Sequence, residues 1–229
     1  MDENRIVFLK KCSLLRGLPD EALAALAART VVTNYAVNQQ IFAQGDEGDE
    51  MLVVIEGRVK INATSPDGKE IIVNTINAGD IFGELSLIDS EPRSASAVAN
   101  RASLILRLRR RDLIPVLEKH PDLALSIMRE LSRKLRNTTA QYEELVFLSV
   151  AGRLARRLAA IAESQADTKS GTVDLILEMT QEEIGQMIGA TRERVNQVLH
   201  RWQNDGLMEI HGRQIRIFDV EEIIAQCEQ

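Results

Sequence analysis

Residues 81–95 combine the side chains and backbone features that a bound phosphate requires. Gly83 has no Cβ and therefore lets the backbone approach a ligand closely. If residues 83–85 open a short helical turn, their N–H groups are unpaired donors, which suits an anion. Arg93 adds a planar and permanently charged fork that matches a phosphate in a bidentate way. The segment therefore predicts an anion-binding site.

Glu84 lies inside this segment, although a carboxylate repels a phosphate. The presence of Glu84 is explained if its carboxylate accepts hydrogen bonds from a neutral hydroxyl such as a ribose 2′-OH. A site for both a phosphate and a ribose hydroxyl is a nucleotide site. The alternative is a surface turn with a weak, exposed ion pair. The longer pattern, Phe-Gly-Glu-Leu at 82–85 and Pro-Arg-Ser-Ala at 92–95, favours the nucleotide interpretation and needs a confirming context.

Length and composition limit the possible classes of protein. The chain has 229 residues, which suits one large or two modest domains. A net charge of −6 argues against indiscriminate binding of nucleic acid or membranes, so any basic surface must be local. Aromatic residues make up only 3%, which argues against base stacking. No apolar run is long enough to span a bilayer and no signal peptide is visible, so no membrane partner is expected. Cys12 and Cys227 lie far apart in the sequence, and free thiols favour a cytoplasmic protein.

The first two thirds of the chain alternate between helical and strand-like patterns. Residues 1–30 are predicted to be helical, and residues 31–110 contain short apolar runs between turn residues, which is typical of a β-roll or barrel. Residues 112–147 are predicted to form a helix with a break at 120–121. Its apolar positions predict a dimer coiled coil, or alternatively a helix packed within one subunit. These positions are Leu131, Leu135, Thr138, Tyr142, Leu145 and then Ser149.

The last third predicts two short helices followed by a hairpin. A helix at 150–163 capped by Ser149, a loop at 164–172 and a strand at 173–178 come first. Thr180 and Glu183 then form a capping box, Gly189 breaks the chain, and Thr191 caps a second helix at 191–205 that Gly206 ends as its C-cap residue. Two helices across a glycine turn predict a helix-turn-helix. Gly212-Arg213 turns the hairpin at 207–218, and a helix at 220–227 follows.

The polar face of the second helix carries side chains that can read base pairs. Arg192 can pair with guanine, Glu193 can accept from a cytosine amine, and Gln197 can read adenine. The alternative is a solvated polar face, but the spacing, caps and hairpin agree with a DNA-reading helix. The candidate DNA-binding residues are Thr180, Gln181, Thr191, Arg192, Glu193, Arg194, Asn196, Gln197, Arg201 and Arg213. Arg216, also in the hairpin, is a further expected phosphate contact.

With both motifs in view, nearly the whole chain resembles the catabolite activator (cyclic AMP receptor protein) family of bacterial regulators. The resemblance implies an α+β fold, with a cyclic nucleotide-binding β-roll and a dimerisation helix (about 112–148) in residues 1–148, and a winged helix-turn-helix in residues 149–229. It also implies that Glu84 takes the ribose 2′-OH, that Arg93 and Ser94 hold the cyclic phosphate, and that Thr138 and Thr139 contact ligands in their own and the partner subunit. The implied ligand-binding residues are Gly83, Glu84, Leu85, Ser86, Arg93, Ser94, Ala95, Thr138 and Thr139.

The resemblance implies a homodimeric transcription regulator. An enzyme is not expected, because the sequence shows no nucleophile–base constellation and no P-loop. The expected effector is cyclic AMP, with cyclic GMP next, and the expected partners are double-stranded DNA with a pseudo-palindromic site and RNA polymerase. The alternative is a family regulator with another effector or none. No metal motif is visible; Cys12 alone excludes a four-cysteine iron–sulfur cluster within a subunit, and the three histidines lie outside the predicted roll, which argues against haem. Gln197 and Ser149 depart from the arginine and aspartate of the family pattern.

Overall fold

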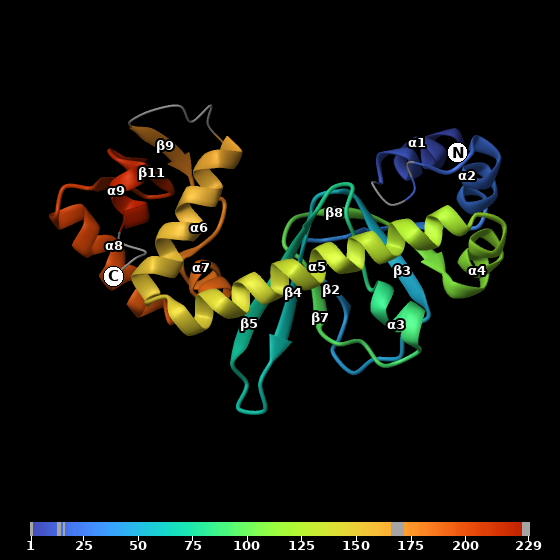
Figure 1. Ribbon diagram of the computed structural model, residues 1–229, viewed down its shortest axis with the longest axis horizontal. Helices are drawn as coiled ribbons and strands as arrows, with labels where there is room; N and C mark the ends of the chain where they lie inside the picture. Colours follow the sequence, from blue (N-terminus) through green and yellow to red (C-terminus); the bar gives the residue numbers. More distant parts are fainter. Residues whose placement is uncertain (1, 13–14, 16, 166–171, 226–229) are drawn as a thin grey trace. The chain divides into compact units, whose positions relative to one another are not determined.

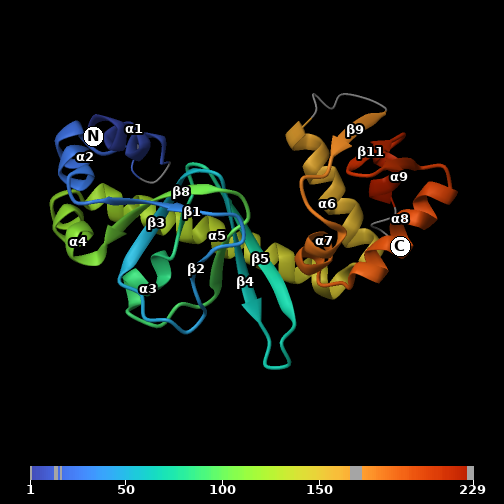
Figure 2. The same cartoon turned by 180° about the vertical axis from the view of Figure 1, so that it is seen from behind.

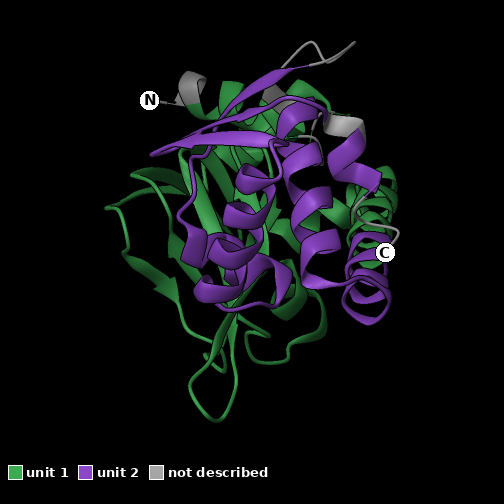
Figure 3. Ribbon diagram, turned by 90° about the vertical axis from the view of Figure 1, so that its left-hand side faces the viewer, with its two compact units in different colours: residues 1–135 green, residues 136–229 purple. Residues whose placement is uncertain are grey.

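The computed structural model describes residues 2–12, 15, 17–165 and 172–225. Packing divides the chain into two compact units, residues 1–135 and residues 136–229, which Figure 3 colours separately. The predicted loop at 164–172 and Cys227 lie mostly or entirely outside the described residues.

The first unit is a β-roll with helices at both ends of its sequence (Figure 1). Its strands form two antiparallel four-stranded sheets with the orders β1-β8-β3-β6 and β2-β7-β4-β5. The helices are α1 (Asp2–Lys11), α2 (Asp20–Ala27), α3 (Glu84–Asp89), α4 (Arg110–Lys119) and the first part of α5 (Pro121–Phe147). The strands are β1 (Val31–Tyr35), β2 (Gln40–Phe42), β3 (Glu50–Glu56), β4 (Arg58–Thr64), β5 (Glu70–Asn77), β6 (Ile81–Phe82), β7 (Ser96–Ala99) and β8 (Ser103–Arg109).

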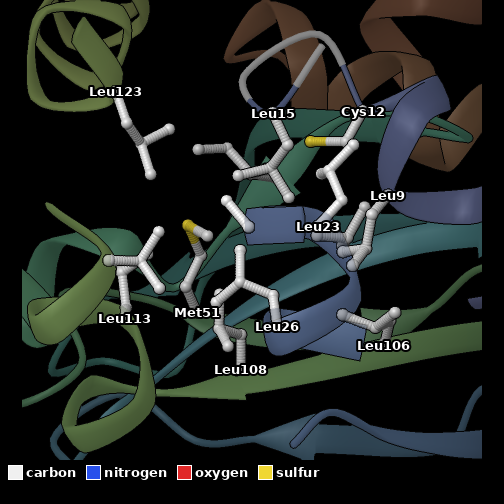
Figure 4. Close-up of a cluster of buried hydrophobic side chains, with 14 of the residues drawn as sticks. Leu9, Cys12, Leu15, Leu23, Leu26, Met51, Leu106, Leu108, Leu113 and Leu123 are labelled. Carbon is white, nitrogen blue, oxygen red and sulfur yellow. The ribbon is translucent and has the colours of Figure 1, made fainter. Parts of the chain in front are cut away.

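The sheet β1-β8-β3-β6 is buried on both faces. One face, with Leu52 and Ile105, packs against the second sheet around Val59 and Ala97. The other face carries Met51, Val53, Leu106 and Leu108 into a second core, which α1, α2, α4 and the start of α5 cover. Figure 4 shows labelled side chains of this second core converging from the helices and the sheet. Burial on both faces explains why residues 51–55 form a continuous apolar run and not an alternating one.

The segment from Phe82 to Ala95 interrupts the roll between β6 and β7. Gly83 has φ +71° and precedes α3, a helix of six residues. This left-handed conformation is easily adopted only by glycine, and it turns the chain from the strand into the helix. The β4–β5 hairpin projects from the roll in both Figure 1 and Figure 2.

The second unit contains the rest of α5 and a helical domain with a small sheet. Its core gathers buried side chains from every one of its elements after α5, including Leu158, Ile184, Leu199, Trp202 and Ile215. The sheet has the antiparallel order β10-β11-β9. The elements are α6 (Val150–Gln165), β9 (Val173–Ile176), α7 (Gln181–Ile188), α8 (Arg192–Asn204), β10 (Met208–His211), β11 (Gln214–Ile217) and α9 (Val220–Ala225).

The sequence-based fold class is confirmed, including the helix break at 120–121 and the two helices before the hairpin. Two details were wrong. The strand at 173–178 ends at Ile176, because its pairing with β11 stops there. Asp205, and not Gly206, is the C-cap of α8; Gly206 follows it with φ +73°. No helix among the described residues is both long and apolar enough to cross a bilayer.

Candidate anion-binding and nucleic-acid-binding sites

Arg93 is buried in the first unit, where its guanidinium is held from several sides. Only 5% of the residue is exposed. Nη1 donates to the carbonyl of Gly83 at 2.6 Å, and Nη2 donates to the carbonyl of Glu50 at 3.0 Å. The guanidinium also lies 4.3 Å from the ring centroid of Phe42, which stacks on Phe82. The side chain is therefore fixed by two carbonyl dipoles and one aromatic face.

Within the described part of the chain, this buried cation has no counter-carboxylate. Among the described residues, no carboxylate oxygen lies within 4.0 Å of its nitrogens, and Nε has no hydrogen-bond partner. Burial lowers the pKa of Arg93 from its ordinary value, and the charges of Glu50, Asp49 and Glu84 partly oppose that shift. A buried charge without a partner is costly. The position is therefore suited to an anion that approaches Nε.

The backbone encloses the guanidinium at two glycines. A Cβ at Gly48 would lie 2.4 Å from Nε of Arg93, and a Cβ at Gly83 would lie 2.6 Å from Nη1. The backbone of Arg93 also exchanges two hydrogen bonds of 2.8 Å with residues 45 and 46. Because both contact points lack a side chain, backbone can lie against the guanidinium without displacing it.

Glu84 is also buried, with 4% of the residue exposed. Its Oε1 is 2.9 Å from Nζ of Lys134 on α5, and this ammonium also donates to the carbonyl of Ile81 at 3.1 Å. Lys134 was not among the residues that the sequence indicated. The sequence could have indicated Lys134, because it precedes the predicted ligand-binding residue Thr138 by four residues and so lies on the same side of the helix.

The other predicted ligand-binding residues have different environments. Ser86 and Ala95 are buried, whereas Leu85 and Ser94 are exposed. The structure thus brings Gly83, Glu84 and Arg93 into one region of the first unit. Thr138 and Thr139 lie on α5 in the second unit, and both are exposed.

The predicted helix-turn-helix is present in the second unit with its caps. Thr180 Oγ1 accepts from the N–H of Glu183 at 3.1 Å, and Glu183 Oε2 accepts from the N–H of Thr180 at 2.9 Å. Gly189 adopts φ +64° and ends α7, and Thr191 caps α8. Val195, Leu199 and Trp202 bury one face of α8. The polar face is thereby turned outward.

Most of the side chains that the sequence proposes for DNA contact are exposed in the second unit. Arg192, Glu193, Arg194, Gln197 and Arg201 are exposed, as is Arg213 at the tip of the β10–β11 hairpin. Asn196 and Gln181 are half-buried, and Thr180 and Thr191 serve as caps.

Arg216, a basic residue of the hairpin, forms an ion pair within its own sheet. Arg216 donates to both carboxylate oxygens of Asp174 at 2.7 and 3.1 Å. The sequence had suggested Arg216 as a phosphate contact of the wing. A phosphate would have to share its guanidinium with Asp174.

Arg153 connects three carbonyl groups at the junction of α5, α6 and α7. Its Nε donates to Ile188 O at 2.7 Å, and its Nη1 donates to Leu148 O at 2.7 Å and Leu145 O at 3.5 Å. The Oγ of Ser149 caps α6 by accepting from Gly152 N at 3.1 Å, which confirms the predicted cap. In the sequence, Arg153 is one of three arginines in this helix, with Arg156 and Arg157. Nothing in the pattern singles it out, because backbone carbonyl acceptors leave no pattern of residue types.

The junction also uses part of the predicted dimer seam. A Cβ at Gly189 would lie 2.8 Å from Cδ2 of Leu145, so this leucine packs on the helix-turn-helix turn. Leu131, at the other end of the seam, packs against the core of the first unit. Leu135 and Tyr142 remain 68% and 67% exposed.

Known families match both units. A sequence model described as the cyclic nucleotide-binding domain matches residues 32–120, and one described as the Crp-like helix-turn-helix domain matches residues 152–225. A "CRP-like cAMP-activated global transcriptional regulator" of Mycobacterium tuberculosis is 31% identical over 223 residues, which are 97% of this chain and 98% of that protein. The "cAMP-activated global transcriptional regulator CRP" of Haemophilus influenzae is 28% identical, covering 80% of this chain and 82% of that protein.

Solved structures share the fold. The c-di-GMP-responsive global regulator CLP of Xanthomonas campestris superposes with a TM-score of 0.76 at 22% identity, covering 87% of this chain and 99% of that one. The catabolite activator protein of Thermus thermophilus gives a TM-score of 0.54 at 27% identity, covering 93% and 98%. Over essentially its full length, this chain therefore belongs to the CRP (catabolite activator) family of transcription regulators, with a cyclic nucleotide-binding domain followed by a Crp-like helix-turn-helix.

Proposed function

We propose that this regulator is a homodimer whose binding to a pseudo-palindromic DNA site is controlled by a cyclic nucleotide. Cyclic AMP is the favoured effector and cyclic GMP the next. RNA polymerase is the expected further partner, and the cytoplasm the expected location.

The observation that carries the effector proposal is the buried guanidinium of Arg93. It has no carboxylate within 4.0 Å among the described residues, and its Nε has no partner. A cyclic phosphate carries one negative charge and acceptor oxygens, so it can neutralise this cation and take the Nε–H. Ser94 follows directly and is exposed, which suits a second hydrogen bond to the same phosphate.

The ribose is assigned to the neighbouring carboxylate. Glu84 has a second oxygen besides the one that Lys134 holds, and a ribose 2′-OH can donate to it. Lys134 offsets the negative charge of Glu84, so a phosphate nearby meets less repulsion. We therefore add Lys134 to the proposed ligand-binding residues, with Gly83, Leu85, Ser86, Ala95, Thr138 and Thr139.

The base preference rests on relatives. Both curated relatives described above are named as cAMP-activated. Thr138 and Thr139 offer hydroxyls that can donate and accept, which serves adenine, whereas Ser94 offers a hydroxyl to a guanine turned over the ribose. A regulator of this family that responds to another effector, or to none, is the alternative.

The dimer proposal is supported by the apolar residues that α5 leaves exposed. Met128, Leu135 and Tyr142 are 53%, 68% and 67% exposed and follow one another at intervals of seven residues. This spacing is that of one position of a heptad repeat, which packs against a second helix. A partner copy of α5 would cover them.

The DNA proposal assigns base reading to α8 and backbone contacts to its surroundings. Arg192, Glu193 and Gln197 are the proposed base contacts, and Arg194, Arg201 and Arg213 are the proposed phosphate contacts. In a dimer the two α8 helices would reach successive major grooves about 34 Å apart. The functional boundary is proposed at residues 148/149, where α5 ends and Ser149 caps α6.

The experiment that tests the function is a titration of the purified full chain with cyclic AMP and cyclic GMP. Calorimetry measures binding, and fluorescence anisotropy of a labelled DNA library measures the affinity for DNA at each effector concentration. Saturable binding of cyclic AMP and tighter DNA binding in its presence are expected. If neither nucleotide binds while DNA affinity stays constant, the chain is the effector-independent regulator.

A further inference from the structure

Glu50 contacts two arginines through two different groups. Its backbone carbonyl accepts from Nη2 of Arg93 at 3.0 Å. Its carboxylate accepts from Nε of Arg107 at 2.9 Å, and the second oxygen accepts from Nη2 of the same arginine. The Glu50 side chain is 15% exposed and that of Arg107 38% exposed. Both carboxylate oxygens of Glu50 therefore pair with Arg107, while only its backbone carbonyl contacts Arg93.

The sheet fixes this geometry. In the antiparallel pair of β3 and β8, Leu52 lies opposite Arg107, and Glu50 lies opposite Arg109. Residues 50 and 52 point to the same face, so the Arg107 side chain reaches the Glu50 carboxylate as a diagonal neighbour across the sheet. A planar guanidinium matches both oxygens of a carboxylate, which a lysine at this position cannot do.

The charge of Glu50 affects Arg93 even in this arrangement. Among the charged groups that act on the pKa of Arg93, Glu50 is the strongest in the direction that favours the cation, and Arg107 acts in the opposite direction. A carboxylate released from Arg107 would meet a guanidinium whose Nε has no hydrogen-bond partner in the residues that the structure describes. Pairing there would satisfy both groups and fill the place where an anion must bind.

We propose that Arg107 is a positioning residue of the effector site: it holds the Glu50 carboxylate away from Arg93 and so keeps Arg93 available to the phosphate of the ligand. This inference rests on the proposed role of Arg93 in effector binding. It assigns the bridge between β3 and β8 a role in ligand affinity beyond joining two strands.

The test combines single and double substitutions. In R107Q the freed Glu50 carboxylate pairs with Arg93, so cyclic AMP binding measured by calorimetry weakens about 10-fold, the size of one charge-assisted interaction. E50Q removes the competing charge, and binding tightens about 2- to 5-fold. In the double variant E50Q/R107Q the side chain of residue 50 carries no charge and cannot compete for Arg93, and affinity returns to within about 3-fold of the wild type. R109Q, which removes an exposed arginine from the same strand, is the matched control for net charge.

Recovery of affinity in the double variant distinguishes a positioning role of Arg107 from a purely structural one. If the bridge only joined β3 to β8, the double variant would be as weak as R107Q or weaker, and that result overturns the proposal, as does an R107Q protein with wild-type affinity. Thermal melting of each variant verifies that the roll is folded.

A ligand-free measurement keeps this inference distinct from the proposed function. In ¹⁵N NMR spectra of arginine Nε–H groups, the Arg93 signal should shift and exchange more slowly with water in R107Q, and return in E50Q/R107Q. An unchanged Arg93 signal overturns the inference whatever the effector is. A wild type that binds neither cyclic nucleotide overturns only the proposed function.

Discussion

The two candidate sites are built in opposite ways. The anion site draws Phe42, Glu50, Gly83, Arg93 and Lys134 from five separate elements and segments, and its contacts span up to 51 positions along the chain. The helix-turn-helix is held by caps three residues apart and by one turn at Gly189. A site of the first kind depends on the whole roll, whereas the second is specified largely by local sequence.

Removal of the Trp202 side chain should have the largest effect, and it should destabilise only the second unit. Its side chain is completely buried in the core of the second unit. Trp202→Ala is expected to destabilise that unit by about 3–5 kcal/mol, the usual cost of a large cavity. Calorimetric unfolding should then show an early transition with loss of DNA binding, while the first unit melts as before. A single, equally shifted transition would mean that the two units do not unfold independently.

Substitution of Arg93 should show how a buried cation can serve binding and not stability. Arg93→Met keeps an apolar stem of similar length but loses two or three charge-assisted hydrogen bonds to a phosphate, each of about 1.5–3 kcal/mol. Cyclic nucleotide affinity is expected to fall at least ~100-fold by calorimetry. The melting temperature should stay unchanged or rise, because a buried charge without a carboxylate partner is removed.

Arg109→Met is the control for this prediction, since it removes an exposed arginine of β8. Its affinity and melting temperature should match the wild type. A large fall in the melting temperature of the Arg93 variant alone would show that the guanidinium is mainly structural, through its bonds to Gly83 and Glu50.

The DNA-reading surface should divide into specific and nonspecific contacts. Arg192→Ala is expected to cost about 1–3 kcal/mol on the preferred site and to relax the preference at one base pair. Arg213→Ala should weaken binding about equally on all sequences and reduce its salt dependence. Anisotropy titrations on a set of single-base variants at two salt concentrations measure both. Equal losses on every sequence for the Arg192 variant would contradict its role in base reading.

The smallest effect is expected from the local cap of α7. Thr180→Ala removes the side-chain acceptor of the Glu183 N–H and should destabilise the second unit by about 1 kcal/mol. Thr180→Ser keeps the acceptor and should retain most of that stability. Denaturant unfolding monitored by Trp202 fluorescence reports the change, and effector binding to the first unit should not respond. A shift in effector affinity would show that the local cap also influences the distant site.

The junction around Arg153 combines both kinds of construction, local contacts and contacts between residues far apart in the sequence. Its donors reach the carbonyls of Ile188, Leu148 and Leu145, which join the ends of α7 and α5 to α6. Part of the apolar seam predicted for dimerisation also packs here through Leu145. Heptad spacing alone therefore could not decide which seam positions face a partner, since the same leucine spacing serves packing within the subunit.

The sequence by itself determined the order of elements, the helix-turn-helix with its caps, and the motif around Arg93 that we propose binds a phosphate. These features are local: a capping box, a left-handed glycine or a motif needs only neighbouring residues. Tertiary structure alone decided that Lys134 pairs with Glu84, that Phe42 and the Glu50 carbonyl hold Arg93, and that Arg107 takes the Glu50 carboxylate. The physical reason is that sheet register and backbone carbonyls bring these groups together, and neither leaves a pattern of residue types along the chain.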